Sequence, residues 1–207
     1  MSRIGIFGGT FDPVHFGHLR SALEVRELLG LEEVRMIPGH HPPHRDTPGA
    51  SAEHRLAMLQ LAVAETSGLV ADDRELRRDS LSYTVDTMLE FRDEFPGKKR
   101  LLFVGIDAFS GFKTWHRWQT ILDLCDLVIL ARPGATLSDS AVTLLDERQV
   151  DSLDEARSAN GNIVVRTLTQ LDISSTVVRQ LFATRRDASF LLPLSVRRYI
   201  DEHGLYR

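Results

Sequence analysis

The sequence predicts an α/β fold, with an open, mostly parallel sheet, helices on both faces and a small helical part at the C-terminus. Two observations support this prediction. Short apolar runs alternate with longer stretches of helical periodicity along most of the chain, which is the pattern of a parallel sheet covered by helices. In addition, 207 residues are enough for one substantial core but not for two comfortable ones, so we expect a single domain over residues 1–207.

Six apolar runs are the expected strands, at residues 3–8, 33–38, 69–72, 100–105, 127–131 and 162–166. The first helix is expected after the first strand, where an apolar stripe ends before Gly30; its members are Leu19, Leu23, Leu28 and Leu29. Further helices are expected at residues 51–63, 83–95, 115–124, 174–183 and 194–203, where N-cap serines or Pro-Gly stop signals mark several ends. Residues 40–50 are expected to be a loop, and the acidic stretch 133–161 a surface helix with loops. This alternation is typical of a Rossmann-like sheet.

Charge and composition exclude several classes of partner. The chain has 25 basic and 29 acidic residues, a net charge of −4, which argues against a nucleic-acid or anionic-membrane binder. The N-terminus does not resemble a secretory leader, and no apolar stretch approaches the roughly 18 residues of a membrane span, so we expect a cytoplasmic protein. The single cysteine, Cys125, lies beside an expected buried strand and is interpreted as an inert packed thiol. Nothing in the sequence indicates an oligomeric state.

A glycine-rich loop follows the first expected strand, in the stretch RIGIFGGTFDPVHFGHL. The strand delivers Gly8 and Gly9 to the carboxyl edge of the sheet, where ligands collect in open α/β folds. Glycines there let an anion approach the backbone N–H groups, and the next helix adds its positive end. The loop matches neither the Walker A nor the dinucleotide pattern. Instead it supplies His15 and His18, which in the first turn of a helix would project to one side and donate hydrogen bonds to phosphoryl oxygens.

Two motifs at opposite ends of the chain resemble the nucleotidyltransferase superfamily. GGTFDPVHFGH resembles its first signature, whose H-x-G-H element is here His15, Gly17 and His18, and ISSTVVR at 173–179 resembles its second. Six further segments are similar to the bacterial nicotinate-mononucleotide adenylyltransferase family: PPHR at 42–45, SYTVDT at 82–87, GIDAF at 105–109, TWHRW at 114–118, ILARPG at 129–134 and YIDEHGLY at 199–206. The resemblance implies adenylyl transfer from ATP to nicotinate mononucleotide, giving nicotinate adenine dinucleotide and pyrophosphate in NAD biosynthesis.

The resemblance also implies which residues bind each substrate. The expected ATP-binding residues are Gly8, Gly9, Thr10, Phe11, His15, His18, Gly105, Asp107, Ile173, Ser174, Ser175, Thr176 and Arg179. His15, His18 and Arg179 are the expected catalytic residues, acting by positioning and by charge stabilisation rather than as nucleophiles. Residues 173–207 would form the helical segment that completes the nucleotide site. No residue is expected to bind a metal directly, because the Mg²⁺ implied by the family would be held mainly by ATP phosphates and water.

The expected acceptor-binding residues are His44, Arg45, Tyr83, Thr84, Asp107, Trp115, His116 and Arg132. Trp115 would offer a flat surface to the pyridine ring, while Trp118 is interpreted as a core residue. Asp107 would accept a hydrogen bond from a ribose hydroxyl, or alternatively cap a helix. The candidate phosphate contacts on the acceptor side are His44, Arg45 and Arg132. Arg45 stands where the family commonly has lysine, which replaces a point charge by a guanidinium fork.

Three other functions stay open at this point. A metal-dependent phosphohydrolase would explain the density of histidines, but such sites usually mix histidine with convergent carboxylates, and the sequence contains no H-E-x-x-H spacing. A protein that senses nucleotides without turning them over would need the same phosphate-binding loop. A related phosphopantetheine-type adenylyltransferase would share a similar first motif but should be shorter and lack TWHRW.

Overall fold

The computed structural model describes residues 2–39, 48–78, 81–132, 134–154 and 159–207. It contains a six-stranded sheet in the order β3-β2-β1-β4-β5-β6. The strands are β1 (Arg3–Gly9), β2 (Glu33–Pro38), β3 (Leu69–Ala71), β4 (Lys99–Gly105), β5 (Asp126–Ala131) and β6 (Ile163–Thr167). Each lies within about one residue of the range expected from the sequence.

The chain order in this sheet reverses between the paired strands β1 and β4. From β1 the chain proceeds to β2 and β3, and from β4 it proceeds in the other direction to β5 and β6. Because crossovers between parallel strands are right-handed, connections that run in opposite directions place their helices on opposite faces of the sheet. The prediction of an open parallel α/β sheet is therefore confirmed.

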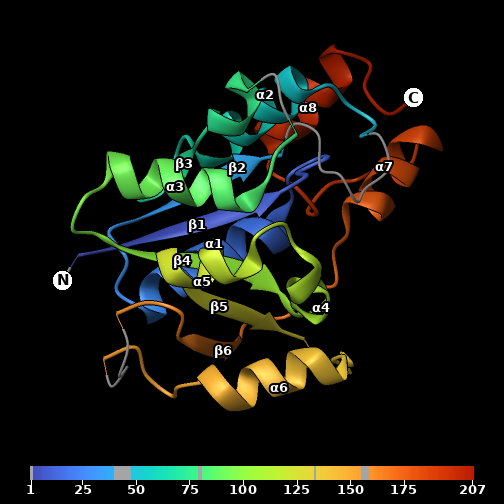
Figure 1. Cartoon of the computed structure of the whole chain (residues 1–207). Helices are drawn as coiled ribbons and strands as arrows, with labels where there is room; N and C mark the ends of the chain where they lie inside the picture. Colours follow the sequence, from blue (N-terminus) through green and yellow to red (C-terminus); the bar gives the residue numbers. More distant parts are fainter. Residues whose placement is uncertain (1, 40–47, 79–80, 133, 155–158) are drawn as a thin grey trace. The chain divides into compact units, whose positions relative to one another are not determined.

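The chain is divided into two compact units, of which the first comprises Met1–Phe7, Val25–Glu33 and Tyr83–Leu168. It contains β4, β5 and β6, whose parallel register pairs Val128 of β5 with Phe103 of β4 and with Val164 of β6. Its helices are α3 (Thr84–Glu94), α4 (Ile106–Ser110), α5 (Trp118–Leu124) and α6 (Asp139–Arg148), with a 3-10 turn η2 (Phe112–Thr114). Figure 1 shows α3 and α5 side by side, and these two helices are in contact.

The second unit comprises Gly8–Glu24, Val34–Ser82 and Thr169–Arg207. It contains β2, β3, most of α1 (Phe16–Leu28), α2 (Ala52–Val63), a 3-10 turn η1 (Arg74–Arg77), α7 (Ser175–Ala183) and α8 (Leu194–Glu202). Helix α2 packs against both β3 and α8, so the C-terminal helix joins the core of this unit. The expectation that residues 1–207 form a single domain stays a prediction.

The buried face of α1 differs from the expected leucine stripe. Ala22 and Val25 are fully buried and Leu29 nearly so, whereas Leu28 is 57% exposed. The buried positions follow the spacing i, i+3, i+7, which a straight helix places on one face. Of the expected stripe, Leu29 is thus buried, Leu19 and Leu23 are half-buried, and only Leu28 is exposed.

One expected helix begins later than predicted, and one short helix was not expected. The expected helix 115–124 is observed as η2 followed by α5, so Trp115 lies between the two elements instead of inside a helix. Asp107, expected in a loop after β4, lies in the short helix α4, whose N-cap is Gly105; the alternative in which Asp107 itself caps a helix is wrong. The stretch 133–161 does contain the expected surface helix, α6, which buries Ala141 and Leu144.

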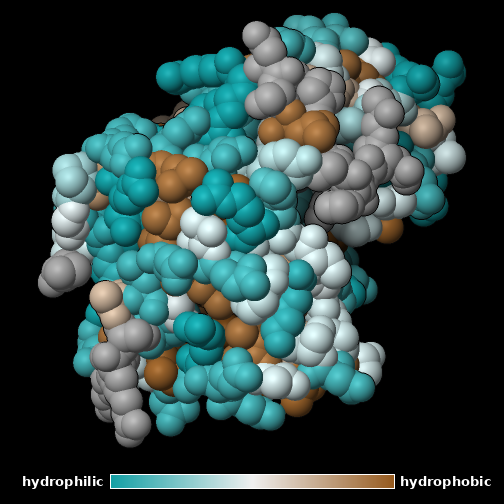
Figure 2. All heavy atoms as spheres, in the orientation of Figure 1, coloured by the Kyte–Doolittle hydropathy of each residue, from teal (hydrophilic) through white to brown (hydrophobic). Residues whose placement is uncertain are grey.

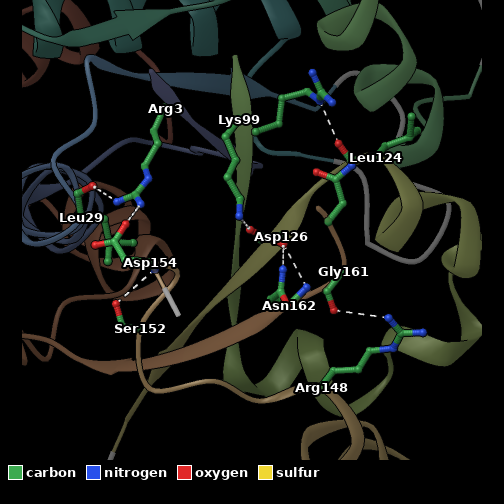
Figure 3. A network of polar contacts seen from close by, with 12 residues as sticks. Arg3, Leu29, Lys99, Leu124, Asp126, Arg148, Ser152, Asp154, Gly161 and Asn162 are labelled. Atoms are coloured by element: carbon green, nitrogen blue, oxygen red, sulfur yellow. Dashed lines mark hydrogen bonds and ion pairs between the residues drawn. The ribbon is translucent and has the colours of Figure 1, made fainter. Parts of the chain in front are cut away.

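A buried polar network holds the amino ends of the central strands in the first unit (Figure 3). Asp126 is fully buried and forms an ion pair of 2.8 Å with Lys99 Nζ. One of its oxygens also accepts hydrogen bonds from the backbone N–H of Asn162, at 2.9 Å, and from its side-chain amide, at 2.8 Å. A buried carboxylate needs such partners, because its desolvation would otherwise cost several kcal/mol.

Hydrophilic residues predominate on the face in view in Figure 2, where hydrophobic residues form separate small groups. In the described part of the chain, no helix combines the length and the apolar character that crossing a membrane requires.

Candidate active site

The glycine loop begins at the end of β1 with two glycines, Gly8 and Gly9, whose surroundings differ. A Cβ atom on Gly9 would lie 2.9 Å from two ring carbons of Phe11, so any larger residue would displace that buried ring. Phe11 itself adopts a left-handed backbone conformation with a φ of 48°, which a non-glycine residue adopts only where its surroundings hold it. A Cβ on Gly8 would meet no atom within 4 Å, so the backbone at Gly8 is open to a ligand.

His15 and His18 form a stacked pair, with ring centroids 3.7 Å apart. His15 immediately precedes α1, instead of lying in its first turn as expected, and only 5% of its surface is exposed. Gly17 makes room for this ring, since a Cβ there would lie 3.0 Å from its Cε1 and Nδ1 atoms. His18 is half-buried in the first turn of α1 and contacts Phe11 edge to face.

Burial sets the charge of this histidine pair. Burial lowers the pKa of His15 from 6.5 to about 4, so His15 is neutral at pH 7. The Nδ1 atom of His18 accepts a hydrogen bond of 3.4 Å from the backbone N–H of His15, which leaves Nε2 as the protonated nitrogen in the neutral ring. Two positive rings 3.7 Å apart would repel by about 4 kcal/mol at an effective dielectric constant of about 20. The pair is therefore suited to donate hydrogen bonds rather than to provide two positive charges.

The second motif lies at the start of α7. Ser174 is the N-cap, as one of the two serines was expected to be, and its Oγ accepts a hydrogen bond from the backbone N–H of Val177. The first N–H groups of a helix have no acceptor within the helix, so those of Ser175 and Thr176 are oriented outward at its positive end. Ile173 precedes this turn and is half-buried.

Two hydrogen bonds tie the second motif to the glycine–histidine loop. The hydroxyl of Ser175 donates to the backbone carbonyl of Pro13 at 3.0 Å, and Nη1 of Arg179 donates to the carbonyl of Asp12 at 2.7 Å. The two motifs are more than 150 residues apart in the sequence, yet both belong to the second unit. The structure thus brings together the histidine pair, the N-terminus of α7 and the guanidinium group of Arg179.

Three buried or half-buried residues that support this loop through hydrogen bonds were not singled out from the sequence. The carboxylate of Asp12 is 3% exposed and accepts hydrogen bonds from the N–H groups of Gly49 and Ala50 and from the hydroxyl of Tyr206. The guanidinium group of Arg55, almost fully buried, donates to the carbonyl of Thr10 at 2.8 Å. Asp12 lies in the first motif and Tyr206 in the C-terminal segment YIDEHGLY. Only their membership of these segments could have indicated from the sequence that they contribute to the site.

The expected acceptor-binding residues that the structure describes belong to the first unit. Tyr83 is the N-cap of α3, and its ring lies 4.5 Å from that of His116, centroid to centroid. Thr84 is the first residue of α3, where backbone N–H groups lack acceptors within the helix. Tyr83, Thr84 and His116 are therefore brought together, and this helix start offers donors to an anionic group.

Asp107 and Arg132 are also brought together, by an exposed ion pair of 2.8 Å. The guanidinium group that was expected to bind phosphate thus has a carboxylate partner. Gly105, just before α4, is exposed, and a Cβ there would meet no atom within 4 Å.

The two tryptophans share one packing partner, Phe112. Trp115 lies 5.2 Å and Trp118 6.2 Å from its ring, centroid to centroid, and both indoles are half-buried. Trp118 is thus less buried than the core position that was expected, and the ammonium group of Lys113 lies 5.7 Å from the centroid of its ring.

His44 and Arg45 lie outside the described residues. Cys125 is fully buried, its Sγ lies 3.3 Å from the carbonyl oxygen of Ile121, and burial raises its pKa, so it is the packed thiol that was expected. Within the described ranges, no group of three or more His, Cys, Asp or Glu side chains is placed to hold a metal ion.

Comparison with known proteins connects this geometry to a family. The cytidylyltransferase-like family matches residues 6–181. A Pseudomonas fluorescens protein named "probable nicotinate-nucleotide adenylyltransferase" is 49% identical over 208 residues, covering 99% of this chain and 97% of that protein. An Aeromonas hydrophila protein with the same name is 46% identical, with 99% and 97% coverage.

Solved structures show the same fold at low identity. A Plasmodium falciparum nicotinic acid mononucleotide adenylyltransferase complexed with APC superimposes with a TM-score of 0.75 at 16% identity, covering 100% of this chain and 98% of that one. The same Plasmodium falciparum enzyme complexed with NaAD gives a TM-score of 0.74 at 17% identity, with the same coverage.

Proposed function

Because the chain belongs to the cytidylyltransferase-like family, we propose that it transfers the adenylyl group of ATP to nicotinate mononucleotide, giving nicotinate adenine dinucleotide and pyrophosphate. Relatives with this activity in their names align over 99% of the chain. The six segments that resemble the bacterial nicotinate-mononucleotide adenylyltransferase family are spread from residue 42 to residue 206, which supports the same assignment.

The observation that carries the proposal is the contact between the two motifs. A triphosphate needs several donors that converge on one place, and the hydrogen bonds of Ser175 and Arg179 to the glycine–histidine loop bring such donors together. In this assignment Gly8, Gly9, Thr10 and Phe11 contact the nucleotide through the backbone, and His15 and His18 donate to the triphosphate. The start of α7 and Arg179 bind the β- and γ-phosphates.

The reaction needs no covalent intermediate on the protein. An oxygen of the 5′-phosphate of nicotinate mononucleotide attacks the α-phosphorus of ATP, a new P–O bond forms there, and the bond from the α-phosphorus to the bridging oxygen breaks. Pyrophosphate leaves with the electron pair. Because the attacking phosphate is largely ionised at pH 7, no side chain has to remove a proton from it. The barrier comes from bringing two anions into line, and fixed donors that stabilise the growing negative charge lower it.

The acceptor is assigned to residues of the first unit. Backbone N–H groups at the start of α3, next to Tyr83 and Thr84, bind the nicotinate carboxylate, and the indole of Trp115 contacts the pyridine ring, with His116 beside it. Asp107 accepts a hydrogen bond from a ribose hydroxyl. Arg132 contacts phosphate from its position beside Asp107, and His44 and Arg45 keep their expected role as phosphate contacts.

The nucleotide substrate is taken to be MgATP. Magnesium prefers oxygen ligands and keeps several waters, so it is bound through phosphates where protein carboxylates are few. The groups that the second unit contributes to the proposed site are histidine rings, hydroxyl groups, backbone N–H groups and a guanidinium group, all of which can donate hydrogen bonds to phosphate oxygens. The partners of the protein are thus two small molecules, and its cytoplasmic location stays a prediction.

The direct test is to incubate the purified protein with MgATP and nicotinate mononucleotide and to measure both products. We expect equal amounts of pyrophosphate and nicotinate adenine dinucleotide, and none without the acceptor. Parallel reactions contain nicotinamide mononucleotide or phosphopantetheine as acceptor, or a simple phosphate ester alone. Turnover of phosphopantetheine in place of the pyridine nucleotide, or release of phosphate from the ester, would replace the proposal by one of its alternatives.

The variant His18→Ala tests the assignment of the histidine pair. It removes one positioned donor, so kcat should fall by about 10²–10³ while the melting temperature changes little. His203→Ala is the matched control, because it removes an exposed histidine from the end of α8. If His18→Ala retained the kcat of His203→Ala, the histidine pair would have no part in the reaction.

A further inference from the structure

The hydroxyl of Tyr206 donates a hydrogen bond of 2.7 Å to the carboxylate of Asp12. This bond links the C-terminal end of the described chain to the glycine–histidine loop. Burial, with the nearby charge of Asp12, raises the pKa of Tyr206, so the hydroxyl keeps its proton and acts as a donor. The backbone of Tyr206 is left-handed, with a φ of 63°, a conformation that a tyrosine adopts only where other contacts hold it.

The carboxylate of Asp12 has two kinds of partner. Neutral donors are the hydroxyl of Tyr206, the N–H of Gly49 at 2.7 Å and the N–H of Ala50 at 3.1 Å. The charged partner is Arg179, whose Nη1 lies 3.6 Å from one carboxylate oxygen, longer than a hydrogen bond. The buried side chain of Arg55 adds a further positive charge nearby; burial lowers the pKa of Arg55, and the charge of Asp12 opposes this shift. The short hydrogen bonds of Asp12 thus come from neutral donors, and its ion pair with Arg179 is longer.

The guanidinium group of Arg179 is held in place in a different way. Its Nη1 donates to the backbone carbonyl of Asp12 at 2.7 Å, and its Nη2 lies 3.4 Å from the hydroxyl of Thr176. These neutral acceptors orient the group without cancelling its charge. A guanidinium group has five N–H donors, so donors remain for a phosphate.

We propose that Tyr206 is a positioning residue for the proposed adenylyl transfer: its hydrogen bond keeps the Asp12 carboxylate from drawing Arg179 away from the phosphates of ATP. The inference rests on the proposed function. Without the hydroxyl, Oδ1 of Asp12 loses a short donor, and the carboxylate becomes more strongly attracted to the guanidinium group of Arg179, whose Nη1 already lies 3.6 Å from Oδ2. A closer Asp12–Arg179 pair would move Arg179 and reduce its attraction for phosphate.

The geometry around Gly49 supports the same coupling. A Cβ atom on Gly49 would lie 3.2 Å from the ring of Tyr206 and 3.3 Å from Cδ of Arg179. The backbone of Gly49 thus fits between these two side chains while its N–H binds Asp12. Any displacement of one member of this group is transmitted to the others by direct contact.

The test compares Tyr206→Phe with Tyr199→Phe. Both tyrosines belong to the C-terminal segment, and each loses one side-chain hydrogen bond; that of Tyr199 joins Nδ1 of His54 at 2.9 Å, on α2. Tyr206→Phe should lose more thermal stability than Tyr199→Phe, because its hydrogen bond goes to a charged group. Tyr206→Phe alone should raise the KM for ATP, by about tenfold, as expected when the displaced Arg179 loses one hydrogen bond to a charged phosphate. The KM for nicotinate mononucleotide should stay unchanged in both.

Two further measurements separate positioning from a general structural effect. In an Arg179→Ala background, measured as binding of α,β-methylene ATP, Tyr206→Phe should have no additional effect, because the group through which it acts is missing. Gly49→Ala keeps the hydroxyl but crowds Tyr206 and Arg179, and it should also raise the KM for ATP.

The inference is overturned if Tyr206→Phe and Tyr199→Phe have the same KM for ATP, if Tyr206→Phe weakens binding equally with and without Arg179, or if Gly49→Ala leaves the KM for ATP unchanged. These outcomes differ from failure of the proposed function, in which the wild-type protein itself would form no nicotinate adenine dinucleotide.

Discussion

The buried His15 should make the stability of this protein depend on pH. Burial lowers its pKa from 6.5 to about 4. Between these values the unfolded chain binds a proton at His15 that the folded chain does not bind, so the free energy of unfolding falls as the pH falls. At about 1.4 kcal/mol for each pH unit, the full difference corresponds to about 3 kcal/mol, of which about 2 kcal/mol is already lost at pH 5.

The variant His15→Gln isolates this contribution. Glutamine does not titrate, so the variant should show a flatter dependence of unfolding free energy on pH in this window, although the loss of the stacked ring lowers its stability at pH 7. Urea unfolding of both proteins at several pH values between 7 and 4 gives the two curves, and titrating groups that do not contact His15 contribute equally to both. Parallel curves would refute the reasoning, because they would mean that His15 binds a proton equally well in the folded and unfolded states.

Two predictions concern the first unit. Trp115→Ala should raise the KM for nicotinate mononucleotide and leave the KM for ATP unchanged, as steady-state kinetics with each substrate varied will show; equal effects on both would indicate that the indole only supports the fold. Asp126→Ala should lower the free energy of unfolding by about 3–5 kcal/mol, because it leaves the ammonium group of Lys99 without its buried partner, and urea unfolding measures this loss directly. A change below 1 kcal/mol would show that Lys99 reaches solvent when Asp126 is removed.

The strands were predictable from local sequence. Each is a short apolar run whose length and β-branched content distinguish it from a helix, and all six begin and end within about one residue of the expected positions. The caps Ser51 and Ser174 were predictable for a related reason, since a serine before a helix satisfies a backbone N–H whatever the tertiary context.

The buried face of α1 was not predictable in the same way. Local periodicity allowed more than one face, and the expected leucine stripe contained Leu29 of the buried face but missed Ala22 and Val25. The choice depends on the distance between the helix and the elements beside it, which no local pattern contains. The environment of Trp115 shows the same limit, because the helix expected to include it begins only at Trp118.

The sequence by itself determined the order of strands and helices, the two motifs and the types of donor they supply. Only the tertiary structure decided that Ser175 and Arg179 bind the loop that carries His15, and that this imidazole is buried and neutral. It also decided that Asp12 is shared by Arg179 and Tyr206. The physical reason is that residue type and local spacing fix which groups a segment can offer, whereas burial, charge and hydrogen-bond partners depend on segments that are distant in the chain.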